Sequence, residues 1–140
     1  MSLDLLAIQD DVTDRLKELA QDVYETEAPE DSKLRFDANG MILPYIVVIH
    51  SDVYDSADSG GIVSTKYDTK DTYVDVVCVA PTERSSRQVA QLVRDKLLGF
   101  VPTNAGEMKI DGNRRYTIKD AKPNRFASEL SFVYPVNIVW

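Results

Sequence analysis

The chain has 140 residues, of which 44% are hydrophobic, and a formal net charge of −7 at pH 7. Its length is close to the commonest size for one domain and its hydrophobic content is typical of a globular chain, so we expect a single domain over residues 1–140. The negative charge argues against general attraction to nucleic-acid phosphates or anionic lipid, because both require a basic surface. The single cysteine, Cys78, excludes an intramolecular disulfide framework and a thiolate zinc cluster.

No targeting segment is predicted. The chain begins with MSLDLLAIQDD, which lacks the basic region and the apolar core of a signal peptide, and no apolar run approaches the ~20 residues of a membrane span. We therefore expect a protein that is made and kept in the cytoplasm unless it leaves as part of a larger assembly.

The first predicted helix is marked by apolar residues that recur at steps of three or four, which places them on one helical face. Asp10 and Asp14 take the opposite, solvated face. A connector containing Pro29 then leads to Asn39-Gly40, a dipeptide typical of a tight β-hairpin turn. The apolar positions of the helix are Leu5, Ile8, Val12, Leu16, Leu19 and Val23.

Two long strands are predicted at Tyr45 to His50 and at Thr72 to Ala80, because both are rich in β-branched and aromatic residues. Alternate residues of the second strand are more apolar than those between them. The sheet is therefore expected to have one covered face and one partly exposed face. Cys78 lies in this strand, and we predict that it is buried in the core.

A second helix is predicted after Pro81, with Ser85 as the N-cap of a capping box that Gln88 completes. Gly99 is placed to end this helix in the left-handed conformation. The predicted apolar stripe consists of Val89, Leu92, Val93 and Leu97.

The rest of the chain is predicted to form a meander of short strands, RRYTI and ASELSFVY, with a turn signal at Asp111-Gly112-Asn113. The order helix, strands, helix, strands predicts an α+β fold. Two main helices should pack on one face of a mostly antiparallel sheet, with a long protruding β-hairpin.

The segment between the two long strands, about 51–72, is rich in aspartate, but its spacing fits no standard site. Asp52, Asp55 and Asp58 are three residues apart, whereas an EF-hand needs acids at alternating positions, then a glycine and a bidentate glutamate. His50 is the only histidine and lacks the partners of a zinc site. We therefore predict that the protein is not an enzyme and has no catalytic residue, metal site or cofactor. Loose coordination of a cation by this loop stays open.

A connection of this length without internal structure is uncommon in a compact domain and is usually functional. Its inner part, GGIVSTKYDT, contains strand-type residues, so we predict a β-hairpin arm that contacts a neighbouring protein. The residues expected at this interface are Val53, Tyr54, Ile62, Val63, Tyr67 and Tyr73.

Three stretches carry a resemblance to a known family: FDANGMILPYIVV, DTYVDVVCVAPTERSSRQVAQLVRDKLLGFVP and RFASELSFVYPV. Over nearly the whole chain, the sequence resembles the tail terminator proteins of long-tailed (siphovirus-type) bacteriophages, especially those of actinobacterial hosts. The most specific parts are NGMILPYIVV, the strand start Asp71-Thr72-Tyr73 and the helix end VRDKLLGFVP.

The resemblance implies a structural virion protein without an active site, located at the tail–head junction. Such a protein forms a ring, usually a hexamer, on the last ring of the tail tube, stops tube polymerisation and joins the head connector. The expected partners are other copies of the chain, the tail tube protein and the head connector or stopper protein, with no membrane partner. DNA would pass through the lumen without specific binding, and acidic residues facing the lumen would repel its backbone.

Three alternatives stay open. The chain could be a head-completion or stopper (neck) protein, which shares size, acidity and ring symmetry with a tail terminator. It could be a small metal-dependent enzyme that uses the aspartate-rich loop. It could also be an interaction module unrelated to phages.

Overall fold

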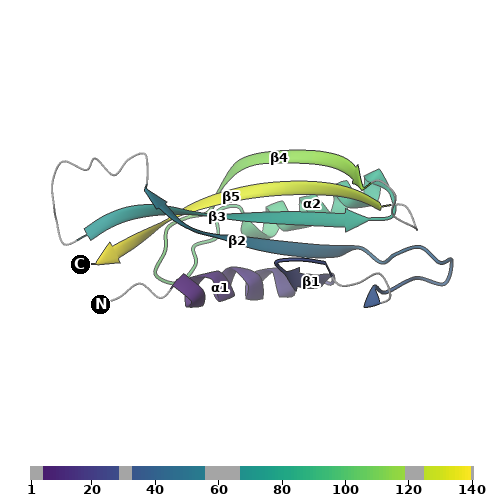
Figure 1. The fold of residues 1–140 in the computed structure, drawn as a ribbon, viewed down its shortest axis with the longest axis horizontal. Helices are drawn as coiled ribbons and strands as arrows, with labels where there is room; N and C mark the ends of the chain where they lie inside the picture. The colour runs from purple at the N-terminus through teal and green to yellow at the C-terminus, as the bar shows by residue number, and fades with distance from the viewer. Residues whose placement is uncertain (1–4, 29–32, 56–66, 119–124, 140) are drawn as a thin grey trace.

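The computed structural model describes residues 5–28, 33–55, 67–118 and 125–139, and of residues 52–55, 67–69 and 137–139 it describes the backbone only. Within these residues the chain forms two helices and five strands in the order α1, β1, β2, β3, α2, β4, β5 (Figure 1). The strands form one sheet in the order β1-β2-β3-β5-β4, and β1–β2 is its parallel pair. The predicted α+β class, with helices packed against a mostly antiparallel sheet, is confirmed.

Helix α1, Leu5–Lys17, buries one face against the sheet, as its apolar spacing predicted. The predicted continuation of this helix to Val23 is wrong. Val23 belongs to β1, Asp22–Glu25, an edge strand that covers the end of the predicted helix and the start of the segment expected to be a connector. The side chain of Val23 still packs against the same core, so the apolar spacing is compatible with a helix or a strand at this residue. The buried residues of α1 are Ile8, Val12, Thr13 and Leu16.

Strands β2, Tyr45–Asp55, and β3, Tyr67–Ala80, are both longer than predicted and pair antiparallel. On the face toward the helices, Cys78 and its alternate neighbours in β3 are fully buried, which confirms the predicted covered face. On the other face, Tyr73, Asp75 and Val77 are partly exposed. Burial raises the pKa of the Cys78 thiol to about 12.

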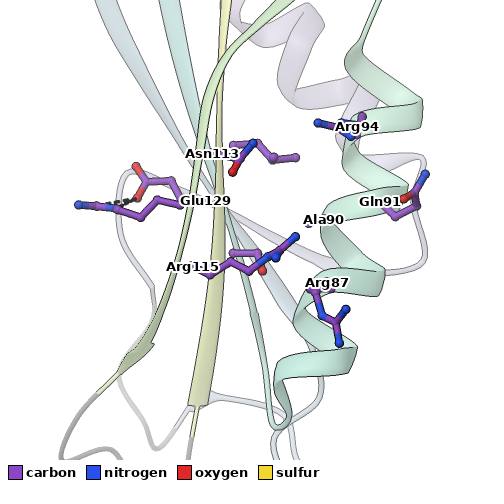
Figure 2. A pocket seen from close by; sticks show the side chains of 10 residues that line it. Arg87, Ala90, Gln91, Arg94, Asn113, Arg115 and Glu129 are labelled. Atoms are coloured by element: carbon purple, nitrogen blue, oxygen red, sulfur yellow. Dashed lines mark hydrogen bonds and ion pairs between the residues drawn. The ribbon is translucent and has the colours of Figure 1, made fainter.

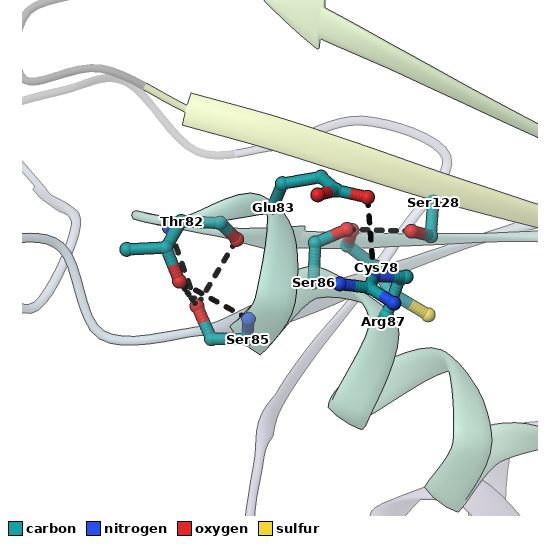
Figure 3. Close-up of polar contacts among 7 residues, drawn as sticks. All are labelled: Cys78, Thr82, Glu83, Ser85, Ser86, Arg87 and Ser128. Atoms are coloured by element: carbon teal, nitrogen blue, oxygen red, sulfur yellow. Dashed lines mark hydrogen bonds and ion pairs between the residues drawn. The ribbon is translucent and has the colours of Figure 1, made fainter.

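Helix α2, Glu83–Leu97, begins one turn earlier than the predicted capping box required. Its N-cap is Thr82, whose hydroxyl accepts from the Ser85 backbone N–H at 3.1 Å, while the Ser85 hydroxyl accepts from the Thr82 N–H at 3.2 Å (Figure 3). Ser85 was predicted as the cap and is instead the third helical residue of the box. Gly99 has φ +82°, as predicted, directly after the C-cap Leu98.

The core stripe of α2 differs from the prediction at one residue. Val89, Val93 and Leu97 are buried, but Leu92 is 44% exposed. Ser86 lies in the core at the end of the stripe instead, where its hydroxyl approaches the Cys78 carbonyl at 3.3 Å (Figure 3). A hydroxyl can lie in an apolar interface when it is hydrogen-bonded, and apolar periodicity alone does not find such a position.

The last two strands, β4, Lys109–Ile118, and β5, Arg125–Val139, pair antiparallel. The turn predicted at 111–113 is wrong, because this stretch lies inside β4. The register shifts there between Ile110 and Gly112, so the glycine signal marks a β-bulge. At the other end of the sheet, residues 33–44 form the predicted small hairpin, with Gly40 at φ +77° and a bridge between Phe36 and Ile42.

Candidate assembly interface

The predicted arm is three strands wide in the part that the structure describes. β3 pairs with β2 as far as Asp55↔Lys70, and with β5 as far as Tyr67↔Val139. Figure 1 shows these three strands continuing past the N-terminal end of α1. The C-terminal strand therefore runs along the arm on the side opposite β2, which the sequence analysis did not foresee.

A serine fixes the base of the arm at a β-bulge between His50 and Val53. The hydroxyl of Ser51 donates to the Tyr73 carbonyl at 2.9 Å and accepts from the Tyr73 backbone N–H at 2.9 Å. One side chain thus bonds both main-chain groups of a residue in the neighbouring strand where the regular ladder is interrupted. The arm leaves the domain from a well-bonded base.

Helix α1 is hydrogen-bonded to the same β-bulge at the base of the arm. The side-chain amide of Gln9 donates to the Ser51 carbonyl at 3.0 Å, and the Thr13 hydroxyl lies 2.8 Å from Nε2 of His50. Burial lowers the pKa of His50, while the carboxylates of Glu25 and Asp10 raise it. The only histidine of the chain therefore joins α1 to the arm base.

The predicted interface residues are only partly placed. Val53 and Tyr54 lie in β2 opposite Thr72 and Asp71, and Tyr67 begins β3. Tyr73 lies in β3 opposite Val133, with its side chain partly buried on the open face of the sheet. Ile62 and Val63 lie outside the described residues. That all six form one interface stays a prediction.

The open face of the sheet carries polar pairs beyond the part covered by the small hairpin. The Ser131 hydroxyl donates to the Asp75 carboxylate at 2.6 Å. Arg114 forms an ion pair with Glu129 at 2.7 Å, and its guanidinium lies 5.2 Å from the ring centre of Tyr116. Glu129 is thus paired within the chain.

A cleft of about 80 Å³ lies between α2 and the edge strand β4 on the other side of the sheet (Figure 2). Figure 2 shows Arg115 extending from β4 toward α2, and Arg94 extending from α2 toward the strands. Arg87 also lines the cleft and is paired with Glu83 at 3.1 Å. The periodicity of α2 could have shown that its outer face is basic, but only the fold brings β4 beside it.

Among the described residues, no group of three or more histidine, cysteine, aspartate or glutamate side chains could hold a metal ion. In the same part of the chain, no helix is long and apolar enough to cross a membrane. Of the aspartates in the predicted loop, Asp58 lies outside the described residues. The candidate interface instead offers hydrogen-bonded strand ends and charged edges of the sheet.

Comparison with known proteins adds little to this geometry. No family model matches the chain, and no curated protein matches it. Among the solved structures that match, one whose printed name states no function has 18% sequence identity and a TM-score of 0.45, over 97% of this chain and 96% of that chain. At this TM-score the match carries no argument about function.

Proposed function

We propose that this chain is a structural virion protein, a tail terminator whose ring caps the tail tube and joins it to the head connector. The resemblance described for the sequence supports the proposal. The structural observation that carries it is the arm, in which β2, β3 and β5 extend together past α1.

The arm is suited to assembly because it extends from the core as part of one continuous sheet. Its middle strand, β3, has neighbours on both sides, and Ser51 bonds its base to Tyr73. A rigid extension of this kind loses little conformational entropy when it binds a partner. Among the described residues, the outer edge of β2 has no strand partner beyond the four residue pairs that join it to β1, so this edge can also pair with a strand of another protein.

In this proposal the partners are further copies of the chain, the tail tube protein on one side of the ring, and the head connector or stopper protein on the other. The ring is hexameric and lies at the tail–head junction of the virion. DNA crosses its lumen without specific binding, since the chain has a net charge of −7.

The test is electron microscopy of tail tube protein polymerised with and without the purified chain. We expect tubes of limited length that end in an added ring when the chain is present, and uncapped, longer tubes when it is absent. Binding to the head connector without binding to tubes would instead assign the chain to the stopper class of neck proteins. Tubes that grow past the chain unchanged would refute the proposal.

A further inference from the structure

The two lateral edges of the molecule carry opposite charge. Residues 5–28, which form α1 and β1, include seven acidic and two basic residues. Residues 83–118, which form α2 and β4, include seven basic and four acidic residues. Because β1 and β4 are the two outermost strands of the sheet, these segments extend to opposite edges (Figure 1). Their helices contact each other between the edges, where the Arg15 side chain of α1 donates to the Lys96 carbonyl of α2 at 3.1 Å.

The basic edge contains cations that no described residue neutralises. Arg84, Arg94 and Arg115 are exposed, and none forms an ion pair or a hydrogen bond through its side chain with another described residue. Arg94 and Arg115 line the cleft between α2 and β4 (Figure 2). Guanidinium groups present several N–H donors in a planar fork, which suits them to bind carboxylates in pairs of hydrogen bonds.

The acidic edge contains matching anions. Asp10 and Asp14 are exposed on α1, four residues apart, so they lie on the same helical face. Among the described residues neither carboxylate has an ion-pair or hydrogen-bond partner. Like charges at this spacing repel each other, and that repulsion is relieved when a cation binds between them.

The acidic edge also exposes a leucine beside its charges. Leu6 is 67% exposed and lies one turn before Asp10. A docked α1 could cover this leucine while its carboxylates reach the arginines of the cleft. An apolar contact inside a charged rim is the usual arrangement of a specific protein interface.

We propose that copies of this chain bind one another head to tail, with Asp10 and Asp14 of one copy in the α2–β4 cleft of the next. The two patches differ, so the contact is heterologous and repeats until a ring closes. Closure into a ring rests on the proposed function. The pairing of the two edges rests on the charge distribution alone.

The test uses two variants that each block one edge. Asp10→Asn/Asp14→Asn removes the anions, and Arg94→Gln/Arg115→Gln removes the unpaired cations of the cleft. By sedimentation velocity, the wild type should form oligomers that weaken between about 50 mM and about 500 mM NaCl, because salt screens exposed charges. Each variant alone should be monomeric. An equimolar mixture should form one-to-one dimers and nothing larger, since only one intact pair of edges remains.

Glu107→Gln/Asp111→Asn is the matched control, because it removes the same charge from exposed positions on the basic edge. It should assemble at least as well as the wild type. A wild type that stays monomeric in low salt, blocked variants that assemble normally, or a mixture that forms no dimer would overturn the inference. So would binding of a labelled DNA duplex that is lost in Arg94→Gln/Arg115→Gln while oligomerisation is unchanged.

The outcomes separate this inference from the proposed function. Rings that form in solution but leave tail tubes uncapped would refute the tail terminator and keep the head-to-tail contact. Tubes capped equally well by both blocked variants would keep the tail terminator and refute the contact.

Discussion

Ser86 of α2 and Ser128 of β5 share a hydrogen bond of 2.6 Å inside the helix–sheet interface, although both residues are almost fully buried (Figure 3). The Ser86 hydroxyl donates to the Cys78 carbonyl of β3, so the Ser128 hydroxyl is the donor to Ser86. The pair therefore ties α2 to two neighbouring strands by polar contacts. A buried hydroxyl that is satisfied in this way specifies one orientation of the helix on the sheet.

The hydroxyls of Ser86 and Ser128 should be energetically coupled. Ser86→Ala leaves the buried Ser128 hydroxyl without its acceptor, and Ser128→Ala removes the donor from which the Ser86 hydroxyl accepts. We expect each variant to lower the free energy of unfolding by about 1–3 kcal/mol. The double variant should cost less than the sum of the two, since no unpaired serine hydroxyl remains. Urea denaturation of all four proteins measures this coupling. Strictly additive losses would show that the hydrogen bond contributes nothing.

A new charge should cost much more stability at one of two adjacent residues of α2 than at the other. Val93 is 0% exposed, so Val93→Asp places an unpaired carboxylate in the core and should cost on the order of 4 kcal/mol or prevent folding. Leu92 is 44% exposed, and Leu92→Asp should cost about 1 kcal/mol or less, mainly through helix propensity. Circular dichroism during heating compares the two variants. Similar losses of stability would contradict the assignment of the buried face.

The Leu92 example shows which part of the fold apolar spacing predicts. The spacing locates α1, α2 and the long strands, because one face of each must enter the core. It cannot choose between Leu92 and Ser86 as core residues, since the exact rotation of α2 depends on the serine contact with β5. The glycine signal at 111–113 likewise marks an irregular backbone, but whether it becomes a turn or a bulge depends on pairing with β5.

The candidate interface could be predicted less completely than the fold. The arm follows from the two long strands and the connection between them. Its third strand, β5, pairs with β3 across a sequence separation of 46 to 72 residues, from Ala80↔Phe126 to Tyr67↔Val139, and no local pattern reports such a pairing. The cleft between α2 and β4 could not be predicted for the same reason. Only the order of the strands in the sheet brings Arg115 to the same cleft as Arg94.

His50 should make the stability of the fold depend on pH. Its pKa in the folded protein lies below the ordinary value of 6.5, chiefly because of burial. As the pH falls through 6.5, the unfolded chain takes up a proton that the folded protein does not, so stability decreases toward acid and is unaffected above that range. We expect His50→Gln to reduce the loss of melting temperature between about pH 7.5 and about pH 5.5, a range above most carboxyl titrations.

An NMR titration provides a second measurement of the same effect. Because His50 is the only histidine, its ring signals are assigned without ambiguity. They should titrate below the value of an unfolded peptide. A titration at or above that value, together with unchanged pH dependence in His50→Gln, would contradict the role of burial.

A close backbone approach should make Gly106 intolerant of a side chain. A Cβ atom at this position would clash with the ring of Pro135, whose Cδ would lie 2.9 Å away. The Gly106 N–H also donates to the Pro135 carbonyl at 2.8 Å, so the segment cannot move away without losing that bond. Gly106→Ala should lower the free energy of unfolding by about 1–3 kcal/mol. Gly112→Ala, where a Cβ meets nothing within 4 Å, is the control and should cost much less in the same denaturation experiment.

The connection at residues 56–66, between β2 and β3 of the arm, should be needed for assembly and dispensable for folding. Replacing residues 56–66 by a short glycine-rich linker removes the connection between β2 and β3 but leaves Ser51, its bonds to Tyr73 and the whole described core in place. We expect a folded monomer whose melting temperature is close to that of the wild type, with weaker ring formation or weaker binding to tail tubes. Ser51→Ala should have a milder effect of the same kind and should speed amide exchange at the arm base, since it loses both bonds to Tyr73. Normal assembly of the linker variant, measured by sedimentation and by electron microscopy of capped tubes, would show that residues 56–66 are not part of the interface.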